Sequence, residues 1–394
     1  MSVSPDHDAG MMSDPSDAQR SLTAAALAFA QKNLDPGTAE REKGDPVKDP
    51  AWRALWQKCG DFGLFGLGVP EEYGGAGHDV LTTIMALEAI GQGCRDNGLT
   101  LAINGHIWTV LYPILAFGSD AQKKKYVPGL CDGSLVGAHG LTERETGSDA
   151  MKMTTTARER DGGFVLNGAK AFVGMGPACD LAIVFAKTDP DKGAWGVSAF
   201  LVETSDAGFI RGAADEKMGL RTVPLGPLGF DNCWIPKDRL LGPVGAGMSI
   251  FQHTMEWERC FIFSSHVGAM ARQLKDCTAY ARSRETFGVP IIDHQSVSNR
   301  LADMRLRLET SRLLLYRAAS LKDKKRPAPL EAAMAKLHIS EAFAASSLDA
   351  VRIFGGRGYL SADGVERDLR DATAGLIYSG TSDIQRQIIA RLLD

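Results

Sequence analysis

The sequence predicts an α+β fold in which a helical region, a strand-rich region and a second helical region follow one another along the chain. Apolar residues recur at helical spacing up to about residue 130, alternate at strand spacing from about residue 153, and return to helical spacing from about Gly245. This order differs from the alternation of strands and helices in βαβ proteins. The glycines contain no G-x-G-x-x-G motif, which argues against a nicotinamide-type Rossmann domain.

The composition limits the partners that we expect. A formal net charge of -4 over 394 residues leaves no basic surface for nucleic acid. The seven cysteines are scattered, odd in number and without metal-ligand spacing, which is typical of reduced thiols in a cytoplasmic protein. Residues 1–17 are polar, so we expect a disordered tail there rather than a signal peptide or a membrane span. We therefore expect a cytoplasmic protein without a metal site, a nucleic-acid partner or a membrane partner.

Residues 18–134 are expected to form an N-terminal helical domain. Five segments carry helical apolar periodicity: Ser21–Leu34, Trp52–Gly60, Val80–Cys94, Leu99–Phe117 and Asp120–Val127. Between the second and the third, Gly66–Gly75 is rich in glycine and contains a proline, which favours a connecting loop.

Residues 135–243 are expected to form a middle β-domain. Five short runs are rich in β-forming residues: Met153–Arg158, Phe164–Leu166, Ala169–Val173, Leu181–Lys187 and Gly196–Val202. Asp161-Gly162-Gly163 and Asn167-Gly168 are sequences that hairpin turns favour. The runs and turns together predict a compact antiparallel barrel or sandwich of about 100 residues.

Residues 244–394 are expected to form a C-terminal four-helix bundle. One helix carries an apolar stripe, which consists of Val297, Leu301, Met304, Leu308 and Leu315. Leu306 and Leu313 lie off this stripe, and a helix that is apolar on more than one face packs on more than one side. The charged segment Lys322–Pro329 is expected to be a loop before the next helix, Glu331–Phe354.

A short polar loop, Leu141–Asp149, separates the first helical region from the strands. Its Gly147-Ser148 pair lets backbone N–H groups come close to an anion or a planar ring, because glycine has no side chain in the way. Taken alone, the same residues fit an ordinary connection between a helix and a strand.

Four separated segments, in the same order along the chain, resemble the acyl-CoA dehydrogenase family. They are Leu141–Asp149, Leu166–Phe172, Arg284–Ile291 with Gln295, and Gly355–Tyr359 with Ser379–Arg386. The resemblance runs from about residue 18 to the C-terminus. It implies the three domains described above, with FAD bound between them and completed by a second subunit. We therefore expect a homodimer or a homotetramer with FAD sites at the subunit boundaries.

The resemblance also implies which residues contact FAD. The residues that would line the flavin or lie beside its ring are Leu141, Thr142, Gly147, Ser148, Phe172, Val173 and Gly174. Those that would hold the diphosphate and adenosine end are Arg284, Phe287, Gln295, Arg352, Gly355 and Gly356, with Thr381 and Asp383 near the same cofactor. An arginine fork suits diphosphate oxygens, and paired glycines allow close backbone approach.

Two of these positions depart from the family pattern. Phe172-Val173-Gly174-Met175-Gly176 stands where the family usually has Trp-Ile-Thr/Ser-Asn-Gly, so an aromatic cover remains but a hydroxyl beside the flavin is lost. Arg352 replaces the usual glutamine on the adenosine side.

The chemistry that the family performs directs attention to two further positions. Oxidation of an acyl thioester at Cα–Cβ needs a base for the α-proton, a flavin for the β-hydride and hydrogen bonds to the thioester oxygen. Most of the family has the base, a glutamate, immediately before the last Gly-Thr, where this chain has Ser379. A minority, including the isovaleryl-type enzymes, carries the glutamate just before an arginine on the helix that opens the C-terminal domain. Glu258-Arg259 matches that arrangement.

We therefore expect Glu258 to be the base. A helical glutamate beside an arginine is more often a solvated ion pair, and it is the serine at position 379 that favours the catalytic interpretation. The apolar neighbours of Glu258 would raise its pKa and make it a better base near neutral pH. By the same resemblance, the residues expected at the substrate are Ser148, Arg259, Tyr378, Ser379 and Gly380.

The local sequences around Glu258, Ser296–Met304 and Tyr378–Thr381 resemble a secondary-metabolism branch that includes the prolyl-carrier-protein dehydrogenases. The implied reaction is α,β-dehydrogenation of an acyl or aminoacyl thioester on a carrier protein, with an electron-transfer flavoprotein or oxygen as the acceptor. A free short or branched acyl-CoA is the alternative substrate. Two other classes stay open, namely a flavin-binding protein without turnover and a flavoenzyme that oxidises nitroalkanes.

Overall fold

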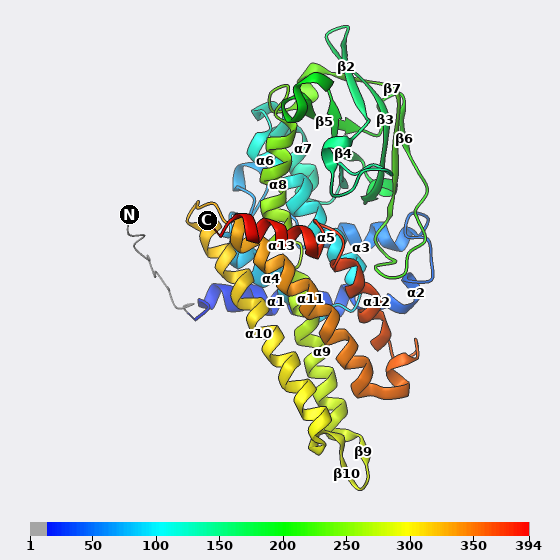
Figure 1. Cartoon of the computed structure of the whole chain (residues 1–394), viewed down its shortest axis with the longest axis vertical. Coiled ribbons are helices and arrows are strands. Elements are labelled where there is room, and N and C mark those ends of the chain that lie inside the picture. Colours follow the sequence, from blue (N-terminus) through cyan, green and yellow to red (C-terminus); the bar gives the residue numbers. More distant parts are fainter. Residues whose placement is uncertain (1–13, 394) are drawn as a thin grey trace.

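The computed structural model describes residues 14–393 (Figure 1). Most of the predicted disordered tail, residues 1–13, lies outside the described residues. The end of that prediction is wrong, because Ser16 caps helix α1 (Asp17–Phe29) and Asp17 is already helical. The Ser16 hydroxyl accepts a hydrogen bond from the Gln19 N–H, and the Gln19 side chain accepts one from the Ser16 N–H, which forms a capping box.

The N-terminal domain is helical, as the apolar periodicity predicts. Its elements after α1 are η1 (Ala30–Leu34), α2 (Thr38–Arg41), α3 (Pro50–Asp61), η2 (Glu71–Tyr73), α4 (Val80–Gly93), α5 (Asn97–Gly105), η3 (His106–Leu111), α6 (Tyr112–Phe117) and α7 (Asp120–Cys131). The stretch Asn97–Phe117 is long and apolar enough to cross a bilayer, but 72% of its most apolar window is buried inside the protein. It is a core segment of this domain.

The middle domain is an eight-stranded mixed sheet. Its strands are β1 (Gly137–Gly140), β2 (Thr156–Arg160), β3 (Gly163–Gly174), β4 (Leu181–Lys187), β5 (Val197–Glu203), β6 (Phe209–Arg211), β7 (Leu225–Pro236) and β8 (Leu240–Leu241). They lie in the order β6-β7-β3-β2-β4-β5-β8, with β1 paired to β4. Most pairs are antiparallel, as predicted, but β1 and β2 both run parallel to β4.

One predicted turn of this domain is wrong. Asn167-Gly168 lies inside the continuous strand β3, where the pairing with β7 slips by a residue. Gly168 has φ 138°, and a Cβ there would lie 2.7 Å from Thr155 Oγ1, so the glycine serves a β-bulge instead of a hairpin. The other predicted turn is confirmed, since Asp161 and Gly162 link β2 to β3 with φ of 52° and 75°.

The C-terminal domain is a helical bundle whose far end carries a small hairpin (Figure 1). Its elements are α8 (Gly247–Phe261), α9 (Ser264–Ser283), β9 (Glu285–Thr286), β10 (Val289–Pro290), η8 (Ile291–Asp293), α10 (Gln295–Asp323), α11 (Pro329–Phe354), η9 (Gly355–Tyr359), α12 (Val365–Gly375) and α13 (Ser382–Arg391). The predicted stripe of α10 is buried. Its second apolar face is not covered by the described residues, because Leu306 is 64% and Leu313 is 56% exposed.

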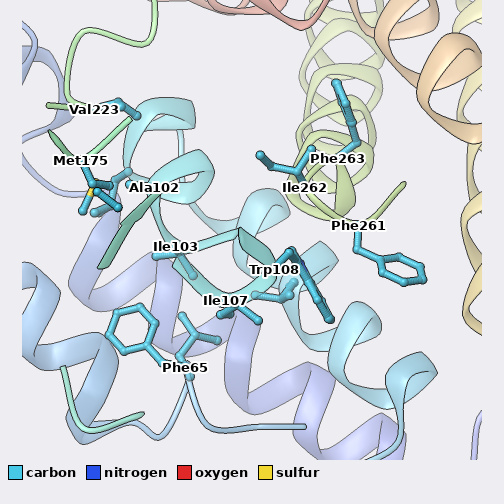
Figure 2. Packing of buried hydrophobic residues seen from close by; sticks show 14 of the residues in the cluster. Phe65, Ala102, Ile103, Ile107, Trp108, Met175, Val223, Phe261, Ile262 and Phe263 are labelled. Carbon is cyan, nitrogen blue, oxygen red and sulfur yellow. The ribbon is translucent and has the colours of Figure 1, made fainter. Parts of the chain in front are cut away.

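One hydrophobic core runs through all three domains. Figure 2 shows part of it, with Trp108 of η3, Met175 after β3 and Phe261 at the end of α8. The N-terminal and C-terminal domains come closest where α4 crosses α9. A Cβ on Gly91 would lie 1.9 Å from the Ser265 carbonyl oxygen, and one on Gly268 would lie 1.9 Å from that of Glu88. The two helices therefore pack backbone against backbone.

A buried carboxylate fixes α12 against the same two domains. Asp368 accepts hydrogen bonds from Arg272 at 3.1 Å, from Gln273 at 3.0 Å and from Asn97 of α5 at 2.8 Å. Burial alone would raise the pKa of Asp368, but Arg272 and these hydrogen bonds outweigh it and hold the pKa below its usual range. The position of α12 is thus set by a charged group that is fully partnered.

We predict that Gly268→Ala lowers the free energy of unfolding by about 1–3 kcal/mol, because the added methyl group forces α4 and α9 apart. Gly105→Ala is the matched control. Apart from Gly105, its two chain neighbours and the backbone of its own helix, no heavy atom of the described chain lies within 4 Å of its Cβ position, and alanine is the better helix former. Urea unfolding of the FAD-loaded protein measures both variants. Equal stability of the two would contradict the close helix contact.

Candidate active site

Glu258 lies in the last turn of α8 and follows Trp257, which belongs to an aromatic cluster with Trp108, Tyr112 and Phe261. The ring of Trp257 lies 4.9 Å from that of Tyr112, 5.7 Å from that of Phe261 and 6.0 Å from that of Trp108, measured between centroids. Trp108 and Phe261 are fully buried, whereas Glu258 itself remains partly accessible. Glu258 therefore shares the last turn of α8 with two members of this cluster, Trp257 and Phe261, and can still be approached.

Glu258 hydrogen-bonds Ser379, the residue at the family's usual base position. The Ser379 hydroxyl donates to Glu258 Oε1 at 2.6 Å. Burial raises the pKa of Glu258 to about 7, and the hydrogen bond from Ser379 and the charge of Arg259 partly oppose that rise. A carboxylate with this pKa is suited to exchange protons near neutral pH.

The segment that carries Ser379 is held from several sides. Tyr378 stacks on Phe263, with ring centroids 5.2 Å apart, and its hydroxyl lies 3.1 Å from His266 Nε2. Gln385 donates to the carbonyl oxygens of Ser379 and Gly380 at 3.2 and 3.0 Å. These contacts come from α9 and α13, so two helices fix the loop between α12 and α13.

A second group of expected residues lies at the edge of the sheet. Leu141 and Thr142 follow β1 directly, and the Thr142 carbonyl accepts a hydrogen bond from the Ala171 N–H of β3 at 2.8 Å. The loop Leu141–Asp149 is thereby attached to the strand that carries Phe172.

A buried ion pair supports this edge. Lys170 Nζ lies 2.8 Å from Glu143 Oε1, and Glu143 also accepts hydrogen bonds from the backbone and hydroxyl groups of Thr154 and Thr155. Burial raises the pKa of Glu143, but the hydrogen bonds from Lys170, Thr155 and Thr154 outweigh it and lower the pKa to about 2. Sequence reasoning missed this pair. A lysine that interrupts the β-rich run Ala169–Val173 was the available signal.

Phe172 points away from the core, as a cover for a planar group would. It has φ 55° at an irregularity of the β3–β7 register, is 61% exposed, and borders a pocket of about 380 Å³ between the loop and β3. Apart from each glycine and its two chain neighbours, no heavy atom of the described chain lies within 4 Å of a Cβ on Gly147 or Gly174. The nearby Thr146 hydroxyl is buried and has no hydrogen-bond partner in residues 14–393. Open backbone and an unpartnered donor fit a flavin at this edge.

The third group lies at the far end of the bundle. Arg284 caps α9, and Phe287 is 97% exposed at φ 53° in the β9–β10 hairpin, which Gln295 of α10 follows. Tyr280 of α9 stacks on Phe354 of α11 at 4.1 Å between ring centroids, which brings Gly355 to the same end.

The surroundings of these residues are open and basic. Apart from the glycines themselves and the residues that flank them, no heavy atom of the described chain lies within 4 Å of a Cβ on Gly355 or Gly356. Arg352 lies 3.5 Å from Asp349, which also pairs with Arg300 and Arg307. Three guanidinium groups therefore share one carboxylate, and the remaining positive charge fits a diphosphate.

One chain does not bring the three groups together. Glu258 precedes α9 and Arg284 follows it, and a helix of 20 residues is about 30 Å long. Figure 1 shows the sheet and the β9–β10 hairpin at opposite ends of the molecule. Thr381, which caps α13, and Asp383, which pairs with Arg386, lie with the Ser379 loop.

Three family models cover nearly the whole chain. They describe the N-terminal, middle and C-terminal domains of acyl-CoA dehydrogenases and match residues 16–134, 138–233 and 245–393. The chain belongs to the acyl-CoA dehydrogenase family. Its predicted three-domain fold is confirmed, and as a family member it is a flavin-dependent acyl-thioester dehydrogenase with FAD as cofactor.

Three proteins illustrate the branches of the family to which this chain is similar. The L-prolyl-[peptidyl-carrier protein] dehydrogenase of Pseudomonas fluorescens is 44% identical over 86% of this chain and 89% of that protein. An acyl-CoA dehydrogenase of Bacillus subtilis is 41% identical over 93% and 95%. The solved structure of PigA with FAD and proline is 38% identical, covers 97% of this chain and 99% of that one, and superimposes with a TM-score of 0.93.

Proposed function

We propose that this acyl-CoA dehydrogenase oxidises an acyl or aminoacyl thioester carried on a carrier protein, with Glu258 as the base for the α-proton. The observation that carries the proposal is the partly accessible Glu258 carboxylate, which contacts Ser379 at the position where most of the family has its glutamate. FAD, when bound, supplies the acceptor for the β-hydride.

The chain's own residues supply the proton transfer. Burial of Glu258 keeps the pKa of its carboxylate near 7. The deprotonated carboxylate takes the α-proton of the thioester while the negative charge moves toward the thioester oxygen. The Arg259 Nε is buried and has no hydrogen-bond partner within residues 14–393, which supports a place for Arg259 at the substrate. Ser148, Tyr378, Ser379 and Gly380 complete the proposed substrate set.

The carrier-bound substrate is supported by the likeness to the Pseudomonas prolyl-carrier dehydrogenase and to PigA. The likeness to the Bacillus acyl-CoA dehydrogenase supports the alternative, a free short or branched acyl-CoA. The seven cysteines are all free, which supports a cytoplasmic location. The proposed electron acceptor is an electron-transfer flavoprotein or oxygen.

We further propose that two subunits share each FAD site, in a homodimer or a homotetramer. The sheet whose strand β3 carries the proposed flavin edge and the β9–β10 hairpin beside the proposed diphosphate end lie at opposite ends of one chain. The exposed Leu306 and Leu313 supply an apolar face on α10 for a partner subunit to cover.

Glu258→Gln should bind FAD but reduce it more than about a hundredfold more slowly, because an amide cannot take the proton. In the parent enzyme, reduction should slow as the pH falls below about 7, since Glu258 is then protonated. Stopped-flow measurement of flavin absorbance with a thioester substrate checks both. Glu256→Gln is the control, because that carboxylate is engaged by Lys322. A Glu258→Gln rate within a few-fold of the parent would refute the assignment.

Arg284→Gln should weaken FAD binding by about tenfold, because it removes a donor fork from the proposed diphosphate site. Arg282→Gln, two residues earlier on the same exposed end of α9, should bind FAD like the parent. Titration of each apoprotein with FAD, followed by fluorescence, measures the two dissociation constants. Equal constants for the two variants would remove Arg284 from the site.

A substrate panel tests the reaction class. We expect anaerobic bleaching of the flavin by prolyl or another aminoacyl group on a carrier protein, and not by straight or branched acyl-CoAs. Bleaching by an acyl-CoA alone would establish the alternative substrate. Bleaching by a nitroalkane alone, or by no compound, would point instead to a nitroalkane oxidase or to a binding protein.

A further inference from the structure

We propose that Ser379 is a positioning residue, which holds the Glu258 carboxylate in place for proton abstraction by donating its hydroxyl hydrogen to Oε1. This inference rests on the proposed function, in which Glu258 is the base. It assigns a positioning role to the serine at a position where most of the family carries the base itself.

The hydrogen bond leaves one carboxylate oxygen available. The Ser379 hydroxyl has a single hydrogen, and it is used on Glu258 Oε1 at 2.6 Å, a length typical of a hydrogen bond to a charged acceptor. Within residues 14–393, Glu258 Oε2 accepts no hydrogen bond. One oxygen therefore fixes the side chain, and the other can receive a proton.

The donor is placed by a backbone conformation that serine rarely adopts. Ser379 has φ 55° and Gly380 has φ 84°, so two consecutive residues are left-handed. The hydrogen bonds from Gln385 and the stacking of Tyr378 on Phe263 keep this conformation in place. A strained residue that is fixed from several sides is typical of functional sites.

Several titratable groups near this part of α8 have partners of their own. Lys322 of α10 pairs with Glu256, Lys336 of α11 donates to the Gly375 carbonyl at 2.9 Å, and Tyr378 contacts His266. Within residues 14–393, the hydrogen bond from Ser379 and the charge of Arg259 oppose the effect of burial on the pKa of Glu258. Loss of the Ser379 hydroxyl should therefore change the pKa of Glu258 directly.

The test is the pH dependence of flavin reduction in Ser379→Ala. Without the donor, the pKa that governs reduction should rise by about one unit, and the limiting rate should fall about tenfold, while FAD stays bound. Ser379→Gly should behave in the same way. Glycine tolerates the left-handed conformation, so this variant also replaces the alanine variant if that one folds poorly.

Ser379→Asn should recover part of the rate and shift the pKa back, because its amide is a donor and asparagine tolerates positive φ. Ser382→Ala is the matched control. Ser382 lies in the same segment, and its buried hydroxyl has no hydrogen-bond partner in the described chain, so its removal should change neither rate nor pKa. A parental pH profile and rate in both Ser379→Ala and Ser379→Gly would overturn the inference.

Failure of the inference can be told apart from failure of the proposed function. If Glu258→Gln still reduces the flavin, Glu258 is not the base and the proposed function is wrong. If Glu258→Gln is inactive but both donor-free Ser379 variants match the parent, Glu258 remains the base and only the role of Ser379 is refuted.

Discussion

The geometry of the candidate site depends on the buried carboxylate of Asp368. A charged group in the interior is tolerated only when it is fully hydrogen-bonded, and Asp368 satisfies this condition through Arg272, Gln273 and Asn97. These partners belong to α9 and α5, so α12 has a single position in which the carboxylate is satisfied. The loop that carries Ser379 leaves the end of α12. The contact between Ser379 and Glu258 therefore depends on a polar network some distance from it.

Packing and electrostatics act together around Glu258. The Gly91–Gly268 crossing lets α4 and α9 approach until their backbones touch, which brings the N-terminal domain against the helix that follows Glu258. Trp108 of the N-terminal domain stacks on Trp257, which precedes Glu258 in α8. Burial also raises the pKa of Glu258. Fold stability and the basicity of the site thus share one physical cause.

The sequence was sufficient for the order of the domains, because helical and strand periodicities are local properties. It was insufficient wherever a residue's role depends on a distant partner. Asn167-Gly168 has the composition of a turn, yet β3 continues through these two residues because it pairs with the neighbouring strand β7 on both sides of them. Strand β1 is only four residues long and pairs with a strand more than forty residues later, so no local pattern revealed it.

The candidate site was predictable to a similar extent. The serine at position 379 and the glutamate at position 258 could be found by resemblance, but their direct contact required the folded chain. The Glu143–Lys170 pair was missed because its two members are 27 residues apart and each is an ordinary surface residue in most contexts. A single charged residue in a sequence reveals neither its own role nor the residue with which it pairs.

The separation between Phe172 and Arg284 also has a thermodynamic consequence. In the proposed site, one FAD is bound by two chains, so cofactor binding and subunit association share the same free energy. Whatever factor the cofactor adds to the association constant of the subunits, association must add to the affinity for the cofactor. Dilution would then release FAD, and loss of FAD would weaken the association of the subunits. Neither event would require a change at Glu258.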